Sequence, residues 1–185
     1  MDTARLAQPT KTSQGVHTMA NSAAVVFVSS NSAGQFDAIS PVVRLQWNGG
    51  ADSVYAFLDA MNRYEDANLR VEHQAMNFAR IAANYIGDWH TVSLFNAPSG
   101  EITAKTLANI NLDTNHGLYV VSKNSVMHFT NGAWLFPKDV NAEREAALKL
   151  AYSTNESDGL NAGIAYHIDE ANIDFFPKAK RAKAA

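Results

Sequence analysis

Short runs of non-polar residues separated by polar turns predict strands at several places along the chain. Residues 23–29 are mostly β-branched or otherwise non-polar, which is typical of a buried strand. Residues 42–47 predict a second strand, and the intervening residues 30–40 are rich in Ser, Asn and Gly and predict a loop. Further strands are expected over residues 89–95, 117–121, 126–130, 133–136 and 163–168.

Three other stretches carry non-polar residues at the spacing of an α-helix. The first begins at Asp52 or Ser53, and the side chain of either residue can cap it. The second covers residues 69–86 and is expected to end at Gly87, because glycine readily adopts the left-handed conformation that closes a helix. The third is expected over residues 142–152.

The order of these elements favours an α+β fold. Asn131-Gly132 between two strands is the strongest hairpin signal in the chain, and short turns make the strands of residues 117–136 antiparallel neighbours. Residues 104–110 fit either a short helix or an irregular loop. The regular strand-helix alternation of a doubly wound parallel fold is missing. We therefore expect a largely antiparallel sheet of about five to six strands, with two to three helices packed on one face.

The 185 residues fall into three parts that differ in pattern and in net charge. Residues 1–18 lack periodicity and predict a flexible leader, residues 19–176 predict a single α+β domain, and residues 177–185 predict a basic tail. The whole chain carries −3, the tail +4 and the leader +1, which leaves −8 on residues 19–176. An acidic body favours basic protein partners and repels nucleic acid, whereas the tail can contact phosphates weakly. No non-polar run approaches the roughly 20 residues of a membrane-spanning helix, so no membrane partner is expected.

Several kinds of chemistry lack their sequence signature. The chain has no cysteine, which excludes disulfides, thiolate metal sites and cysteine nucleophiles. It also lacks the serine nucleophile elbow, the H-E-x-x-H zinc motif and both common glycine-rich phosphate loops. We accordingly assign no catalytic residue, no metal ligand and no cofactor. His90 and His116, with Asp88 or Asp113, form a conceivable acid-base or metal site, although the favoured interpretation is that both are ordinary polar side chains.

The candidate binding residues gather at the ends of predicted strands. The Asn48-Gly49-Gly50 turn follows Trp47 and precedes a helix, so it is either a tight turn or a place where a ligand meets backbone N–H groups. Each tryptophan lies at or near a strand end, where its ring either packs or stacks on a ligand. The candidate binding residues are Arg44, Trp47, Asn48, Gly49, Gly50, Trp89, His90 and His116.

Two segments carry a resemblance to known proteins. Residues 42–58, VVRLQWNGGADSVYAFL, and residues 113–121, DTNHGLYVV, resemble segments of small uncharacterised proteins of phages, prophages and other bacterial mobile elements. In those proteins a strand ends in a W-[ND]-G-G-like turn and a helix follows. The resemblance covers about residues 42–122, and Ala51-Asp52 stand where Pro-Glu is expected. It implies a mobile-element origin and a compact α+β domain, and it transfers no catalytic residue.

These observations favour a non-enzymatic accessory protein of a phage or mobile element. It is expected in the bacterial cytoplasm, where it binds and occludes a host factor, such as a defence or nucleic-acid-processing protein. Three alternatives stay open. They are a protein that sequesters a small molecule or nucleotide, a self-assembling phage structural protein, and a hydrolase that uses His90, His116 and Asp88. A small homo-oligomer also stays open.

Overall fold

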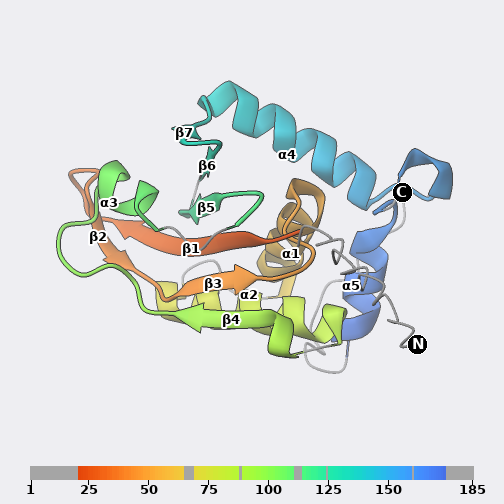
Figure 1. The fold of residues 1–185 in the computed structure, drawn as a ribbon. Coiled ribbons are helices and arrows are strands. Elements are labelled where there is room, and N and C mark those ends of the chain that lie inside the picture. Colours follow the sequence, from red (N-terminus) through yellow and green to blue (C-terminus); the bar gives the residue numbers. More distant parts are fainter. Residues whose placement is uncertain are drawn as a thin grey trace, which may run out of the picture.

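The computed structural model describes residues 21–64, 69–87, 89–110, 114–123, 125–159 and 161–173. The expected leader (1–18) and basic tail (177–185) lie outside these residues. Within them the chain forms five α-helices and seven strands (Figure 1). In chain order the elements are β1 (Ala23–Ser30), β2 (Phe36–Ile39), β3 (Val42–Leu45), α1 (Ala51–Tyr64), α2 (Val71–Ile86), the 3₁₀ helix η1 (Trp89–Thr91), β4 (Val92–Phe95), α3 (Ala104–Ala108), β5 (Leu118–Val121), β6 (Val126–Thr130), β7 (Ala133–Trp134), α4 (Pro137–Ala151), the 3₁₀ helix η2 (Glu156–Asp158) and α5 (Ile164–Asn172).

The strands form one sheet in the order β4-β3-β1-β5-β6-β7, and β2 pairs with the C-terminal part of β1. β1 and β5 run parallel, whereas the other described pairs are antiparallel. The expected α+β fold with a largely antiparallel sheet is therefore confirmed. The Asn131-Gly132 hairpin between β6 and β7 is also confirmed, with φ of 52° and 78° at its two residues. Positive φ at both central residues is the geometry that matches the twist of a two-residue hairpin.

β1 is the centre of the core because both of its faces are covered. Val25 and Phe27 face a layer built from α1, α2, α4 and α5. Val26 points the opposite way, toward a smaller core that α3 closes with the fully buried Leu107. Both faces of β1 are non-polar, as is usual for a strand buried on two sides. The sequence predicted helices on one face of the sheet. The larger helix layer lies on one face, and α3 covers the other face.

The segment 163–168 corrects a sequence-based prediction, because it is helical rather than a strand. Gly163 adopts a left-handed conformation with φ of 76°, and α5 begins directly after it. Ile164, Ala165 and Ile168 are all buried, which is a helical spacing rather than an alternating one. Six residues are too few for periodicity to separate a buried strand from one face of a helix.

The expected loop over residues 30–40 contains a strand, since β2 forms a hairpin with the end of β1. The side chain of Asn31 stabilises the hairpin turn by accepting hydrogen bonds from the backbone N–H groups of Ala33 and Gln35, each at 3.0 Å. The four residues of β2 are too few for a periodic pattern to distinguish a strand from a loop.

Three element boundaries also differ from the sequence-based predictions. The third predicted helix begins at Pro137, not after Asn141, because proline suits the first helical position, where its missing N–H is not needed. The strand expected over 89–95 starts with a 3₁₀ turn, and the one expected over 133–136 is shorter. The ambiguous segment 104–110 contains the short helix α3, capped by the hydroxyl of Thr103.

Candidate functional site

The turn between β3 and α1 holds four of the candidate binding residues, and its glycines serve the backbone packing. The N–H of Gly49 donates to the carbonyl oxygen of Asn21 at 2.7 Å. A Cβ on Gly49 would lie 2.3 Å from the backbone nitrogen of Ala23, so no larger residue fits without moving the chain. A Cβ on Gly50 would lie 2.7 Å from Asp52 Oδ1. Close backbone packing therefore explains Gly49, whereas the nearest contact at Gly50 is a side chain.

Asp52 occupies the place at this turn where an anionic ligand would bind. Its Oδ1 accepts the N–H of Ser53 at 2.8 Å, and its Oδ2 accepts the Nδ2 group of Asn161 at 2.5 Å. A carboxylate at the start of α1 already interacts favourably with the positive end of the helix dipole. Asn48 adopts a left-handed φ of 55°, and Trp47 beside it stays 41% exposed. This arrangement favours the tight-turn interpretation over a phosphate cradle.

The tryptophans do not form one stacking platform. Trp47 follows β3 and Trp134 lies on β7, and three strands separate the two. At about 4.8 Å per strand, these positions are roughly 19 Å apart across the sheet. Trp134 packs its ring 5.1 Å from that of Phe129, while the side chain of Trp89 lies outside the described part of the chain. Arg44 points to the α3 side of the sheet, where its Nε is buried without a hydrogen-bond partner among the described residues.

His90 and His116 lie at the same end of the strands of the sheet, but next to strands that are not neighbours. His90 is in η1, immediately before β4, and His116 precedes β5. The register aligns the starts of β4 and β5 across β3 and β1, so three strand spacings, or roughly 14 Å, separate them. Asp88 and Asp113 are outside the described residues. The backbone therefore does not bring the two histidines together for a proton relay.

His128 on β6 is a cross-strand residue buried in a polar network. Its ring stacks on Tyr119 with a centroid distance of 4.0 Å, and only 3% of the residue is exposed. Nε2 donates to the carbonyl oxygen of His116 at 2.7 Å, and Nδ1 lies 3.0 Å from Oε2 of Glu143. Tyr55 donates to the same Oε2 at 3.2 Å. The network joins β5 and β6 to α1 and α4.

The phenols of this network stay neutral. Burial raises the pKa of Tyr55, and the adjacent Glu143 carboxylate raises it further. The same two causes raise the pKa of Tyr119, whose hydroxyl finds no hydrogen-bond partner in the described part of the chain. Because His128 is almost fully buried, a substrate does not reach it. We interpret the network as structural, because its hydrogen bonds connect the sheet to α1 and α4.

A second polar cluster joins the helices further along α1. The guanidinium of Arg63 lies between two carboxylates, 3.1 Å from Asp59 and 2.8 Å from Asp169. Tyr152 donates to Asp59 at 2.5 Å, and Tyr64 donates to Asp169. Burial is the largest cause that raises the pKa of each of these two tyrosines, and the hydrogen bond to its carboxylate partner raises it further. The cluster connects α1, the end of α4 and α5, and it leaves Asp59 fully engaged.

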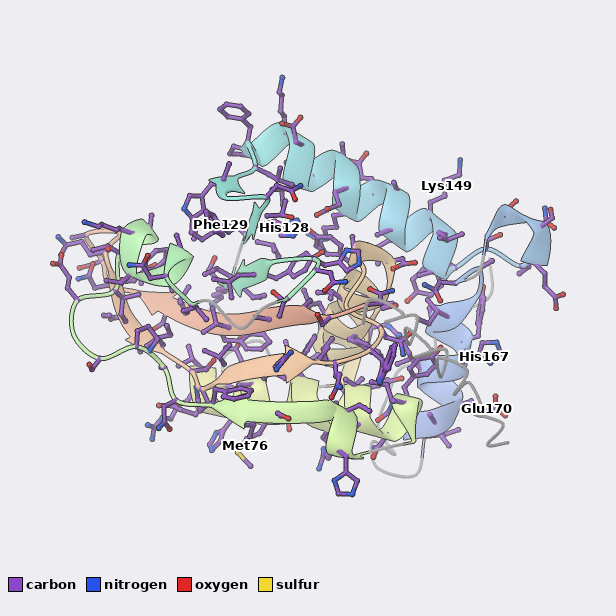
Figure 2. The ribbon with its side chains drawn as sticks, in the orientation of Figure 1. Met76, His128, Phe129, Lys149, His167 and Glu170 are labelled. Carbon is purple, nitrogen blue, oxygen red and sulfur yellow. The ribbon has the colours of Figure 1, made fainter. Side chains whose placement is uncertain are left out.

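The clearest unpartnered surface is the outer edge of β4. Among the described residues no strand pairs with this edge. Leu94 is 53% exposed and Phe95 is 40% exposed, on opposite faces of the strand. Met76 of α2 is 59% exposed and projects beside β4 (Figure 2). The strand contains no charge, proline or bulge, which are the features that usually keep an edge strand from pairing.

No family model matches this chain, and neither the curated proteins nor the solved structures gave a match. The resemblance to mobile-element proteins therefore stays a prediction from the sequence. None of the described helices is both long and non-polar enough to cross a membrane. Within the described ranges, no three His, Cys, Asp or Glu side chains group closely enough to hold a metal ion.

The turn interpretation predicts that Gly49→Ala is costly for steric reasons. We expect it to lower the free energy of unfolding by about 2 to 3 kcal/mol, because the added methyl group collides with backbone atoms. Gly34→Ala is the matched control, since its Cβ would meet no atom within 4 Å and only its positive φ is strained. That change is expected to cost about 1 kcal/mol. Urea denaturation measures both, and equal losses would contradict the packing role.

The His128 network predicts a loss of stability in Glu143→Ala. We expect the free energy of unfolding to fall by about 1 to 3 kcal/mol, because His128 and Tyr55 both lose their acceptor. Glu145→Ala removes the same charge from an exposed position of the same helix and should stay within about 0.5 kcal/mol of the wild type. Thermal and urea denaturation compare the two variants. A Glu143 variant as stable as the Glu145 variant would argue against the network.

Proposed function

We propose that this protein is a non-enzymatic binding protein that docks a host protein on the open edge of β4 and occludes it. The observation that carries the proposal is the unpaired edge with exposed non-polar side chains on both of its faces, at Leu94 and Phe95. Such an edge accepts an extended segment of a partner as an additional strand. Main-chain hydrogen bonds then supply affinity, and the exposed side chains supply selectivity.

The charge of the chain supports a basic partner. Residues 19–176 carry a formal −8, and an anionic surface accelerates association with a cationic protein. β4 itself carries no charge, so the electrostatic attraction that steers a cationic partner comes from the rest of the surface. The β4 edge then provides the binding contact. A host factor that binds nucleic acid has the complementary charge, and occlusion of its basic surface would block its normal ligand. The resemblance to mobile-element proteins supports the same kind of target.

A second copy of this chain is the other partner that the same edge favours. An antiparallel β4–β4 pair about a two-fold axis would place Ser93 or Leu94 opposite the same residue of the second copy, with no charge opposed to a like charge. This is the homo-oligomer that the sequence analysis left open. Size-exclusion chromatography with light scattering separates the two cases, because a monomer leaves the edge free for a host protein and a dimer occupies it.

The proposal predicts that Leu94→Lys combined with Phe95→Lys abolishes partner capture. Lysines on an edge strand disfavour strand addition, and both positions are exposed enough to leave the fold intact. We expect at least tenfold less recovery of a host protein from bacterial lysate, measured by affinity capture and quantitative mass spectrometry. The matched control is Phe136→Lys, because Phe136 is 71% exposed at the start of α4, beside the opposite edge of the sheet.

Two outcomes would overturn the proposal. If the wild-type chain captures no protein above background, there is no host partner. If the β4 variant captures as much protein as the wild type does, the partner does not bind at the β4 edge. Thermal denaturation checks that the double variant melts within a few degrees of the Phe136 control. The readout is therefore independent of a folding defect.

A further inference from the structure

The dipeptide Asn-Gly occurs twice in the chain, as Asn48-Gly49 and as Asn131-Gly132. An asparagine followed by glycine is chemically labile, because the backbone nitrogen of the glycine can attack the side-chain amide carbon of the asparagine. Glycine has no Cβ to hinder that approach. Both asparagines adopt nearly the same left-handed conformation, with φ of 55° at Asn48 and 52° at Asn131. The surroundings of the two dipeptides therefore decide which one reacts.

The backbone nitrogen of Gly49 is held in place by the fold. Its N–H donates to the carbonyl oxygen of Asn21 at 2.7 Å, and Gly49 is buried. A Cβ on Gly49 would lie 2.3 Å from the backbone nitrogen of Ala23, so the neighbouring segment covers this turn closely. To attack the side chain of Asn48, the nitrogen would have to lose its proton and leave this hydrogen bond. The folded chain therefore protects Asn48, which reacts only after local unfolding.

The backbone nitrogen of Gly132 has none of these restraints. The β6–β7 ladder ends at the pair of Thr130 and Ala133, so Asn131 and Gly132 are the two central residues of the hairpin turn. Both are exposed, and a Cβ on Gly132 would meet no atom within 4 Å. Among the described residues, no group accepts the N–H of Gly132 and none pairs with the side-chain amide of Asn131. Water and hydroxide therefore reach the reacting atoms without any unfolding.

We propose that Asn131 is a self-modifying site, which converts to aspartate and isoaspartate while Asn48 stays intact in the same folded molecule. Hydroxide removes the proton of the Gly132 nitrogen, which then bonds to the side-chain carbon of Asn131. The side-chain nitrogen takes a proton from water and leaves as ammonia, and a succinimide ring remains. Water next breaks either the new bond, which gives aspartate, or the original peptide bond, which gives isoaspartate. Overall, water is consumed, ammonia is released, and nothing is oxidised or reduced.

The two products change the hairpin differently. Aspartate is also favoured before glycine in a two-residue hairpin turn, so it keeps the turn and adds a negative charge. Isoaspartate carries the main chain through the side-chain carbons, which lengthens the turn by one methylene group. The added length no longer fits a turn that pairs Thr130 directly with Ala133.

The hairpin also leads into α4, so isoaspartate affects more than the turn (Figure 1). The N–H of Leu135 donates to the carbonyl oxygen of His128 at 2.9 Å, and the ring of Trp134 lies 5.1 Å from that of Phe129. A longer turn shifts the register of both contacts just before α4 begins at Pro137. The β4 edge is at the other end of the strand order, so the modification is independent of partner docking there.

Incubation of the full chain in mildly alkaline buffer tests the site. The buffer is made with heavy-oxygen water, so that peptide mapping by mass spectrometry separates the reaction from any that occurs during digestion. In the folded chain we expect the Asn131 peptide to react at least about tenfold faster than the Asn48 peptide, because only Asn48 needs local unfolding. In concentrated urea the two rates should converge to within about threefold, since the protection of Asn48 is lost. Methyl transfer by an isoaspartyl methyltransferase identifies the isoaspartate.

The variant Asn131→Gln should remove the isoaspartate signal of the folded chain, because glutamine closes the larger ring much more slowly. Asn109→Gln is the matched control and should leave the signal unchanged, since Asn109 is also exposed but precedes the bulky Ile110. Thermal denaturation confirms that both variants fold. Two results would overturn the proposal. One is an Asn131 peptide that stays unmodified in the folded chain while it reacts in urea, and the other is an Asn48 peptide that reacts as fast as the Asn131 peptide in the folded chain.

Discussion

The structure depends on the double-sided burial of β1. Its side chains alternate between the four-helix layer and the smaller α3 side, and all but the last two residues of the strand are buried. Because hydrocarbon side chains fill both faces, the centre of the sheet has no room for a reactive group. Polar and exposed groups are left at the periphery of the sheet. The β3–α1 turn and the free side of β4 occupy different parts of that periphery.

Buried polar clusters position the helices against this core without offering chemistry. The His128–Glu143 pair ties the sheet to α4, and Arg63 ties α1 to α5 through Asp169. Asp59 and Asp169 each accept a hydrogen bond from a tyrosine as well as from Arg63, and these hydrogen bonds offset the desolvation of the two carboxylates.

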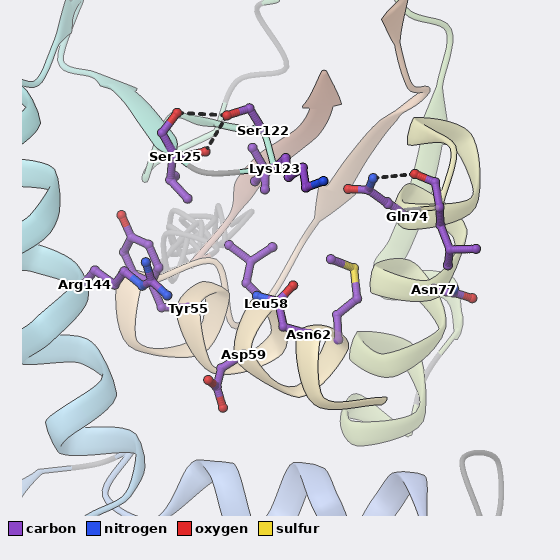
Figure 3. Close-up of a pocket in the computed structure, with 14 residues that line it drawn as sticks. Tyr55, Leu58, Asp59, Asn62, Gln74, Asn77, Ser122, Lys123, Ser125 and Arg144 are labelled. Atoms are coloured by element: carbon purple, nitrogen blue, oxygen red, sulfur yellow. Dashed lines mark hydrogen bonds between the residues drawn. The ribbon is translucent and has the colours of Figure 1, made fainter. Parts of the chain in front are cut away.

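The sequence predicted the elements with strong local patterns. The strand at 23–29, the helix at 69–86 and the Asn131-Gly132 hairpin follow from β-branched runs, helical spacing and turn chemistry, and all three are present. The helix at residues 163–168 was missed because a six-residue non-polar run fits two periodicities. The cavity between α1, α2 and α4 (Figure 3) was not predictable, since Tyr55 and Arg144, which line it, lie far apart in the chain and converge only through tertiary packing. Burial of the glycine turn likewise depends on a neighbouring segment that no local pattern specifies.

The parallel pairing of β1 with β5 has a consequence for biosynthesis. Ala24 pairs with Leu118, roughly 90 residues later in the chain, so the sheet cannot close until most of the polypeptide has left the ribosome. At translation rates of about 5–20 residues per second, that interval lasts roughly 5–20 seconds. Throughout it, the most non-polar strand of the protein has one unpaired side. Until β5 is made, this exposed side of β1 is open to the non-native contacts that lead to aggregation.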